Sequence, residues 1–214
     1  MSMIRLAEIR YPVTTLGPGT RLGVWLQGCH IGCSACMSRD TWDPGAAEPK
    51  EVDEVIRHVL GIVDERIDGI TISGGEPFEQ PAALAALIDG LRDALVLHPV
   101  EIDVLCYSGF SFAELERSHP ALLARLDAII PEPFLPGEAT DLPWRGSANQ
   151  PLVALSAVGK DRYGDVSAPA RAVQLDVSGG HLAIVGIPRR GDLARVERKL
   201  AAAGIRLQDT TWRP

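Results

Sequence analysis

Cysteine is scarce in this sequence, and long hydrophobic runs are absent. Only four of the 214 residues are cysteines. The N-terminal stretch "MSMIRLAEIRYPV" is broken by charges and contains no apolar run of signal-peptide length, and no later segment approaches membrane-spanning length. We therefore expect a cytoplasmic protein without a membrane partner. A reducing compartment disfavours structural disulfides, so the few cysteines favour metal binding or redox chemistry.

Basic residues are few relative to acidic ones. The sequence contains 21 Lys and Arg residues against 28 Asp and Glu residues, which gives a net charge of −7. The sequence-independent part of nucleic-acid binding comes from Lys and Arg that meet phosphates, and no Lys/Arg-rich run offsets the deficit. The charge therefore argues against nucleic acid as the main partner. Internal repeats and low-complexity tracts are also absent.

What is present is an alternation of strand and helix patterns. The chain of 214 residues is long enough for one well-buried domain with a small appendage. The patterns predict helices over 50–65, 84–95 and 112–126, and strands over 21–28, 68–73, 101–109 and 126–130. This βα repeat indicates a mostly parallel sheet. About five parallel strands are too few for a closed eight-stranded barrel, so the expected fold class is α/β with a partial (βα) barrel.

The pattern changes after the last of these strands. Segment 131–150 contains four prolines and is predicted to be a long ordered loop before a short strand over 152–156. We expect a hairpin that turns at Gly179 and Gly180, then a helix over 192–203 and a last short strand near Ile205. The sequence thus predicts a core domain, 1–170, and a small C-terminal β-hairpin and helix extension, 171–214.

The stretch "QGCHIGCSACMSRDTWD" places Cys29, Cys33 and Cys36 within eight residues, directly after the first predicted strand. A closed zinc site would need a fourth ligand such as His30 or Cys106, but zinc ligands usually come in two pairs and His30 is adjacent to Cys29. Three thiolates can instead hold a [4Fe-4S] cluster and leave one iron free for a cofactor or substrate. Cys106 is expected to be a buried strand residue.

The motif "GGEP" follows the next strand. Its glycines permit the backbone to approach a ligand closely, and the Glu76 carboxylate can accept hydrogen bonds from an ammonium group. Tyr107 and Ser108 lie at the end of the third strand. Because ligands bind at the carboxyl ends of strands in such sheets, these segments and the Pro-rich loop are predicted to form one active site.

The cysteine motif and "GGEP" together resemble the radical S-adenosylmethionine superfamily. The resemblance implies that Cys29, Cys33 and Cys36 bind a [4Fe-4S] cluster. It also implies which residues hold the methionine end of S-adenosylmethionine, namely Ser73, Gly74, Gly75 and Glu76. A reduced cluster would pass one electron to the cofactor, giving methionine and a 5′-deoxyadenosyl radical.

A finer resemblance is to the glycyl-radical activating enzymes. The cysteine loop with "RDTWD" is similar to that of the pyruvate formate-lyase type, whereas "CYSGF" and "LPWRGSANQ" are similar to the anaerobic ribonucleotide reductase type. The resemblance implies hydrogen abstraction from a glycine of a protein partner, with an electron donor such as flavodoxin or ferredoxin. Tyr107 and Ser108 would contact the adenosine or ribose of the cofactor. Arg145 and Asn149 would contact the nucleotide, or "RGSANQ" would be a polar turn. Met37, Ser38 and "IIPEPF" depart from the pattern of the family.

Two alternatives are open. A radical enzyme of this kind could act on a small molecule, as in 7-deazaguanine biosynthesis, or on another peptide, although "RDTWD" and "RGSANQ" disfavour the small-molecule reading. The chain could also be a zinc-stabilised binding protein without catalysis, which would be colourless and hold stoichiometric zinc.

Overall fold

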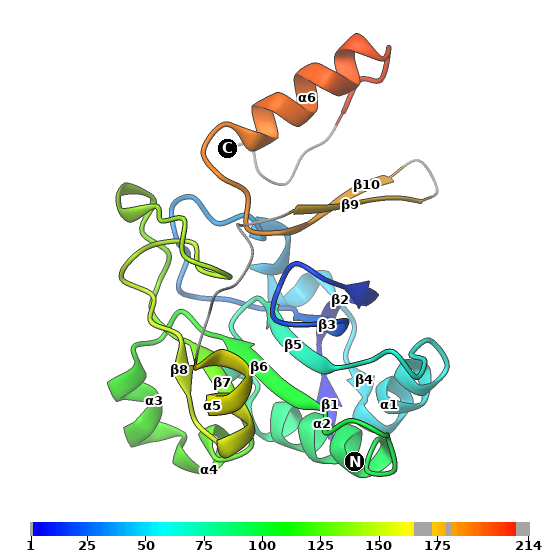
Figure 1. Cartoon of the computed structure of the whole chain (residues 1–214), viewed down its shortest axis with the longest axis vertical. Helices are drawn as coiled ribbons and strands as arrows, with labels where there is room; N and C mark the ends of the chain where they lie inside the picture. The colour runs from blue at the N-terminus through cyan, green and yellow to red at the C-terminus, as the bar shows by residue number, and fades with distance from the viewer. Residues whose placement is uncertain (1, 165–172, 179–180, 209–214) are drawn as a thin grey trace.

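The computed structural model describes residues 2–164, 173–178 and 181–208, and a six-stranded sheet lies at its centre (Figure 1). The strand order is β2-β3-β5-β6-β7-β8. The bounds are β2 Leu6–Val13, β3 Arg21–Leu26, β5 Gly69–Gly74, β6 Asp103–Tyr107, β7 Ala128–Ile130 and β8 Val153–Ala154. Strands β3, β5, β6 and β7 are parallel, whereas β2 and β8 are antiparallel to their neighbours.

The predicted mixed α/β fold with a mostly parallel sheet is therefore confirmed. The expectation of about five parallel strands is wrong in one respect, because the short strand β8 runs antiparallel to β7. The reason is the connection: the Pro-rich segment contains no α-helix that would return the chain to the other end of the sheet. The antiparallel edge strand β2 was not predicted from the sequence.

Helices cover the sheet on both faces. Their bounds are α1 Val52–Leu60, α2 Pro81–Ala94, α3 Phe112–Ser118, α4 Pro120–Leu123 and α5 Ala157–Tyr163. Short 3-10 turns are η1 Arg39–Thr41, η2 Pro44–Ala46, η3 Pro77–Glu79 and η4 Pro136–Glu138. No helix in the described ranges is long and apolar enough to span a membrane.

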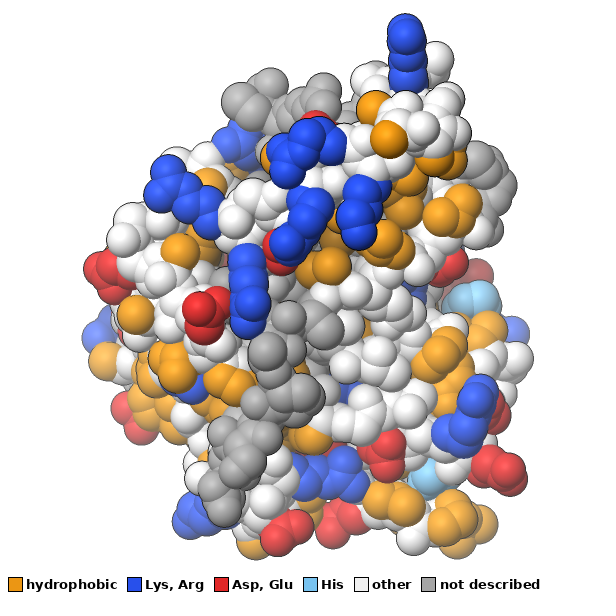
Figure 2. Space-filling model, turned by 45° about the horizontal axis from the view of Figure 1, so that its top comes forward, with side chains coloured by type: hydrophobic (Ala, Val, Ile, Leu, Met, Phe, Trp, Pro, Cys, Tyr) orange, Lys and Arg blue, Asp and Glu red, His pale blue; other side chains and the backbone are white. Residues whose placement is uncertain are grey.

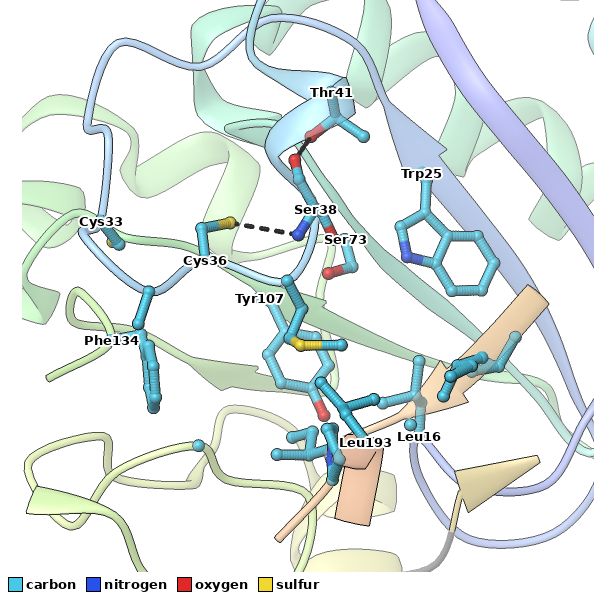
Figure 3. A pocket seen from close by; sticks show the side chains of 18 of the residues that line it. Leu16, Trp25, Cys33, Cys36, Ser38, Thr41, Ser73, Tyr107, Phe134 and Leu193 are labelled. Atoms are coloured by element: carbon cyan, nitrogen blue, oxygen red, sulfur yellow. Dashed lines mark hydrogen bonds between the residues drawn. The ribbon is translucent and has the colours of Figure 1, made fainter. Parts of the chain in front are cut away.

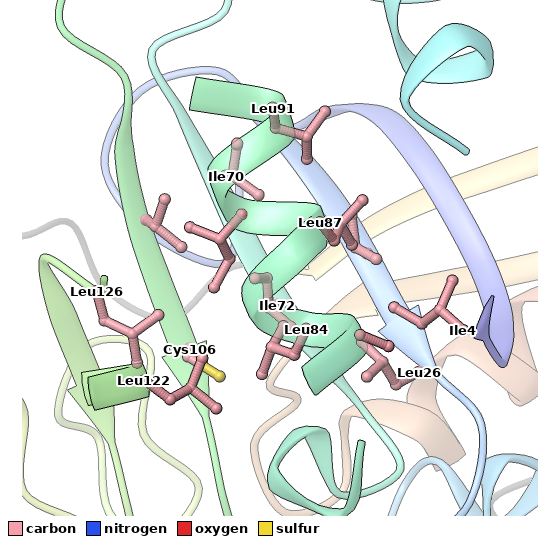
Figure 4. Packing of buried hydrophobic residues seen from close by; sticks show 14 of the residues in the cluster. Ile4, Leu26, Ile70, Ile72, Leu84, Leu87, Leu91, Cys106, Leu122 and Leu126 are labelled. Atoms are coloured by element: carbon pink, nitrogen blue, oxygen red, sulfur yellow. The ribbon is translucent and has the colours of Figure 1, made fainter. Parts of the chain in front are cut away.

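The main core lies between the sheet and α2. Leu84, Leu87 and Leu91 repeat on one face of α2 and are fully buried, and Figure 4 shows them packed over Ile70 and Ile72 of β5. Burial of each such side chain contributes about 1.5–3 kcal/mol. The alternation of side chains along each strand divides the sheet between two cores. A second, smaller core on the other face contains Leu105, Ala128, Ile130 and Tyr163.

A buried ion network closes the amino end of the parallel strands. Arg21, at the start of β3, forms two hydrogen bonds with Asp103, at the start of β6, at 3.1 and 2.8 Å. Arg162 of α5 also donates to Asp103, at 2.8 Å, and so does the Tyr163 hydroxyl. Arg21 and Asp103 are both fully buried, so each depends on the other for compensation of its charge.

Two small sheets flank the central one. Strand β1, Met3–Ile4, pairs with β4, Lys50–Glu51, and β9, Val173–Ser178, pairs with β10, His181–Gly186, before helix α6, Asp192–Ala202. The predicted hairpin and C-terminal helix are confirmed. The expected turn at Gly179 and Gly180 and the boundary near residue 170 lie outside the described residues. The strand expected near Ile205 is wrong: this residue is 52% exposed and lies in a segment without regular secondary structure that pairs with no described strand.

Candidate functional site

The cysteine loop begins where β3 ends, and the segment after it closes its base. The Gly28 N–H donates to the Thr41 carbonyl at 2.7 Å, and the Cys29 N–H donates to the Trp42 carbonyl at 3.0 Å. The Gln27 side-chain amide donates to two further carbonyls, those of Asp40 and Asp43. "RDTWD" therefore has a local role: its backbone carbonyls fix both ends of the loop that carries the three thiols.

Cys29, Cys33 and Cys36 are all reduced and partly exposed. Burial raises the pKa of the Cys29 thiol, while N–H groups of Gly32 and Ile31 that bond its sulfur oppose the shift. Burial likewise raises the pKa of Cys33, and a backbone N–H from Phe134 opposes it. Such N–H groups stabilise sulfur in its thiolate form.

These residues fit a [4Fe-4S] cluster better than a single metal ion. Within the described residues, no three His, Cys, Asp or Glu side chains are placed to hold one metal ion together. A four-iron cube binds each thiolate through a different iron, so its three cysteines are spread around the cube. Cys106, a candidate fourth ligand, is fully buried in the main core, and burial raises the pKa of its thiol well above the ordinary value.

The "GGEP" loop fits tightly against the cysteine loop. The Gly75 N–H donates to the Leu26 carbonyl and the Glu76 N–H donates to the Gly28 carbonyl, each at 2.7 Å. Gly74 has a φ of +100°, and a Cβ atom on Gly75 would lie 2.1 Å from the Gly28 carbonyl oxygen. Only glycine fits these two positions, because a side chain would push the two loops apart.

The Glu76 side chain is buried and connects "GGEP" to the next strand end. Its carboxylate accepts hydrogen bonds from the Phe78 N–H at 3.0 Å, the Ser108 hydroxyl at 2.9 Å and the Gly109 N–H at 2.7 Å. Burial raises the pKa of Glu76 to about 7, and the three donors oppose that shift. The carboxylate thus anchors the loop after β6, while its predicted contact with an ammonium group stays a prediction.

Tyr107 and Ser108 were predicted together but lie in different surroundings. The Tyr107 side chain faces the cavity described below, and its hydroxyl donates to the Trp144 carbonyl at 2.8 Å. Ser108 is 5% exposed, and its hydroxyl is shared between Glu76 and the Phe110 N–H. The structure therefore brings Tyr107, rather than the Ser108 hydroxyl, to the surface of the cavity.

The "RGSANQ" segment folds the Pro-rich loop back on itself. Asn149 donates to the Pro133 carbonyl at 2.9 Å, and Gln150 donates to the Glu132 carbonyl at 3.0 Å. The buried Oδ1 atom of Asn149 has no hydrogen-bond partner among the described residues, and Arg145 is partly buried with its pKa lowered by desolvation. Neither residue lines the cavity in this arrangement, so their nucleotide contacts stay predictions.

A cavity of about 1140 Å³ opens at the carboxyl ends of the strands. Its lining includes Cys33 and Phe134, which lie next to each other in Figure 3, and Cys36, Ser73 and Tyr107, which lie between them and Trp25 in that view. The C-terminal extension forms a further wall. The lining includes residues that the sequence did not point to, among them Leu16, Trp25, Leu182, Ile184, Arg189 and Arg190.

Only a weak sequence signal could have found these additional residues. Trp25 is a bulky side chain directly before the cysteine loop, and it is the one residue of β3 that is not fully buried. The hairpin residues alternate as in any strand pair, so nothing in their pattern places them over the site.

Comparison with known proteins identifies the family. The family model described as "4Fe-4S single cluster domain" matches residues 15–153. An anaerobic ribonucleoside-triphosphate reductase-activating protein from Vibrio cholerae is 34% identical over 65% of this chain and 92% of its own length, and that of Escherichia coli is 26% identical over the same shares. A pyruvate formate-lyase-activating enzyme from Clostridium pasteurianum is 33% identical over 41% of this chain and 38% of its own length.

The chain therefore belongs to the family of proteins with a 4Fe-4S single cluster domain. Its relatives further define it as a radical S-adenosylmethionine oxidoreductase of the glycyl-radical activating type, with a [4Fe-4S] cluster and S-adenosylmethionine as cofactors. The predicted resemblance is confirmed. The crystal structure of QueE from Escherichia coli has a TM-score of 0.41 and 16% identity over 50% of this chain and 53% of that chain, which is too low to define a shared fold.

Proposed function

We propose that this protein cleaves S-adenosylmethionine reductively and takes a hydrogen atom from a glycine of a glycyl-radical enzyme, such as an anaerobic ribonucleotide reductase. The observation that supports this most strongly is that Cys33 and Cys36, Ser73 directly before "GGEP", and Tyr107 at the end of β6 line one cavity, while Glu76 connects these segments beneath it. When bound, the reduced cluster supplies the electron that splits the cofactor into methionine and a 5′-deoxyadenosyl radical.

The residues of the chain have distinct parts in this proposal. Cys29, Cys33 and Cys36 hold the cluster, and the loop of Ser73 to Glu76 holds the methionine end. Glu76 keeps that loop in register with Ser108 through buried hydrogen bonds. Tyr107 faces the cavity from the adjacent strand end, where an adenosine would lie. Arg145 and Asn149 would reach the nucleotide if the Pro-rich loop moves when the cofactor binds.

The shape of the sheet supports a protein partner. Its two edge strands, β2 and β8, are at opposite ends of the strand order and do not pair with each other. We therefore interpret the sheet as a partial barrel. A partner that inserts a glycine-bearing loop would complete the wall and keep water away from the radical. The electron would come from a small donor protein such as flavodoxin or ferredoxin. The core domain 1–170 would carry the chemistry, and 171–214 would be a separate extension.

The decisive experiment mixes the anaerobically reconstituted, reduced protein with S-adenosylmethionine and a glycyl-radical enzyme from the same organism. Electron paramagnetic resonance should show a carbon-centred radical with the doublet splitting of a glycine α-hydrogen. Changing the target glycine to Ala should abolish the doublet. If every glycyl-radical enzyme stays silent while a purine precursor or an unrelated peptide drives cofactor cleavage, the glycine target is refuted. A colourless protein with stoichiometric zinc would refute the radical chemistry too.

A further inference from the structure

The C-terminal part of the chain has the opposite charge to the rest. Segment 189–206 contains six of the 21 Lys and Arg residues and only two of the 28 Asp and Glu residues. Its net charge is +4 in a chain whose net charge is −7. The basic residues are spread along a helix and its flanks rather than in one run. Figure 2 shows Lys and Arg side chains gathered together with hydrophobic ones on this face of the molecule.

Helix α6 is amphipathic but has no buried residue. Leu193, Val196 and Leu200 lie three and four residues apart on one side and are only half-buried, whereas Arg198 and Lys199 are exposed. A helix stabilised by packing would bury its apolar side. In Figure 1 the helix lies beyond the hairpin, at the end of the molecule opposite to α2.

The β9–β10 hairpin has one face fixed to the core and one face open. On the fixed face, Asp176 pairs with Arg10 at 2.8 Å, Gln174 donates to the Pro12 carbonyl at 2.9 Å, and Val185 is buried. On the opposite face, Leu175 and Val177 are 49% and 74% exposed. Paired residues of antiparallel strands share a face, so Ile184 and Leu182, which pair with these two, extend the apolar surface across β10.

This apolar and basic surface adjoins the cavity. Leu193, Arg189 and Arg190 line the cavity next to the cysteine loop. The surface also lies outside residues 15–153, the part of the chain that the cluster-domain model matches. It is therefore an addition to the catalytic core that a partner entering the cavity would meet.

We propose that the outer face of β9–β10 and helix α6 form a docking surface for an acidic, apolar-bearing segment of the protein partner; this rests on the proposed function. Arg189 and Arg195 are paired with Asp141 and Asp192, while segment 189–206 as a whole has a net charge of +4. An apolar surface beside such a segment is complementary to a partner segment that alternates carboxylates with aliphatic residues. Attraction between opposite charges speeds encounter, and the apolar strip then holds the complex. Docking there would bring the glycine loop of the partner to the cavity.

The test compares two charge-reversed variants. Arg198→Glu with Lys199→Glu changes α6, and Arg57→Glu with Arg117→Glu changes two exposed residues of α1 and α3, far from the cavity. Glycyl-radical formation is measured against partner concentration at two salt concentrations. The α6 variant should need about tenfold more partner for half-maximal rate, with an unchanged maximal rate and a weaker salt dependence. The control should change less than twofold.

A third variant separates the apolar contribution from charge. Leu175→Ser with Val177→Ser should raise the half-maximal partner concentration about fivefold and leave the salt dependence as in the wild type. Slow, partner-independent cofactor cleavage should be the same in all variants, because none of these residues lies in the cofactor site.

The two proposals fail in different ways. Radical formation with equal partner dependence in the α6 variant and in the Arg57/Arg117 control would overturn the docking surface and leave the activase function intact. If no partner gives a radical, fluorescence titration of the same partner with the labelled protein still decides the docking question, since weaker binding of the α6 variant is expected there too. Tighter binding of duplex DNA than of the partner to the wild type would also overturn the proposal.

Discussion

At the residue scale, the four cysteines form two groups that differ in exposure to solvent. Cys29, Cys33 and Cys36 are partly exposed on one loop, and two of them line the cavity. Cys106 is fully buried among aliphatic side chains on the main-core face of β6, away from that loop. Because a thiol in an apolar environment keeps its proton, Cys106 is unsuited to bind iron.

We predict that replacing Cys29, Cys33 or Cys36 with Ala removes the brown colour that anaerobic reconstitution with iron and sulfide gives the wild type. Each variant loses one of the three proposed cluster ligands. Cys106→Ala serves as the matched control and should keep the colour and the iron content. Loss of the cluster in Cys106→Ala would show that the fourth cysteine is a ligand.

Glu76 combines burial with three hydrogen-bond donors, so its removal should affect stability as well as the site. Glu76→Ala leaves the Ser108 hydroxyl and the N–H groups of Phe78 and Gly109 without their acceptor. We expect the free energy of unfolding to fall by about 3 kcal/mol. Affinity for S-adenosylmethionine should fall too, since the loop loses its anchor, while the cluster still assembles. Urea unfolding measures the change in the free energy of unfolding. The control Glu116→Ala replaces an exposed residue of α3 and should change this free energy by less than about 0.5 kcal/mol, as surface substitutions usually do.

The raised pKa of Glu76 gives the stability a pH dependence. With a pKa of about 7 in the folded protein and an ordinary value of 4.5, the folded state holds more protons than the unfolded state between these values. The free energy of unfolding contributed by this group therefore falls as pH rises from 4.5 to 7, by roughly 2–3 kcal/mol. Urea unfolding of the metal-free wild type and of Glu76→Gln across this range should show the difference. A parallel pH dependence in the two proteins would mean that Glu76 is not perturbed.

At the scale of the elements, the carboxyl ends of the parallel strands form the site, and the amino ends stabilise the sheet. The carboxyl ends carry the glycine-rich and cysteine loops. The amino ends are joined by Arg21 and Asp103, with Arg162 and Tyr163 added from α5. A Cβ atom on Gly69 would lie 2.3 Å from the Arg21 guanidinium, so β5 must have glycine at its start to let the ion pair cross beneath it. The network thereby holds three strands in register.

We expect Asp103→Ala to lower the free energy of unfolding by about 3–5 kcal/mol, because it leaves the Arg21 charge buried and uncompensated. Asp89→Ala removes an exposed pair with Arg125 and should cost less than about 1 kcal/mol. Urea unfolding of both variants provides the comparison. Equal, small effects would show that water reaches Arg21 once its partner is removed.

At the scale of the whole molecule, the three cysteines, "GGEP" and the six-stranded sheet all lie within the first 154 residues. The contacts of the extension with this core include the ion pairs Arg10–Asp176 and Arg189–Asp141 and hydrogen bonds of Gln174 to the backbone of β2 and the turn after it. Val185 also packs with Val13 and Leu16. These contacts are few compared with the main core. We therefore expect the cluster loop to keep its fold when the extension is removed.

We predict that a chain lacking residues 171–214 still assembles the cluster and slowly cleaves S-adenosylmethionine, but activates its protein partner poorly. Its melting temperature should fall, because Val13 and Leu16 become exposed. Iron content, deoxyadenosine formation and glycyl-radical yield measure the three effects. Failure of the truncated chain to bind iron, while Val185→Ala binds it normally, would show that the extension is part of the catalytic core.

Local patterns in the sequence determined the class of protein. The spacing of three cysteines on one loop, the glycines of "GGEP" and the βα alternation each depend on neighbouring residues, so they could be recognised without a structure. The predicted strands of 21–130 therefore agree in place with those observed, and so do the helices, with two corrections. The helix predicted over 50–65 ends at Leu60, and the one predicted over 112–126 is interrupted at His119, before Pro120, so that it forms α3 and α4. The direction of β8 and the edge strand β2 could not be predicted, because pairing depends on which sheet edge remains open after the other strands are placed.

The tertiary structure alone decided how the site is lined. Glu76 could be recognised as a member of a motif, but only the fold shows its carboxylate buried against Ser108 and Gly109. Arg10, Trp25 and the β10 residues come to one cavity from distant parts of the chain. Contacts of this kind follow from the packing of whole elements, which depends on shape and burial summed over many residues. A short motif contains no information about them, whereas the proposed ligands of the cluster could be named from the motif alone.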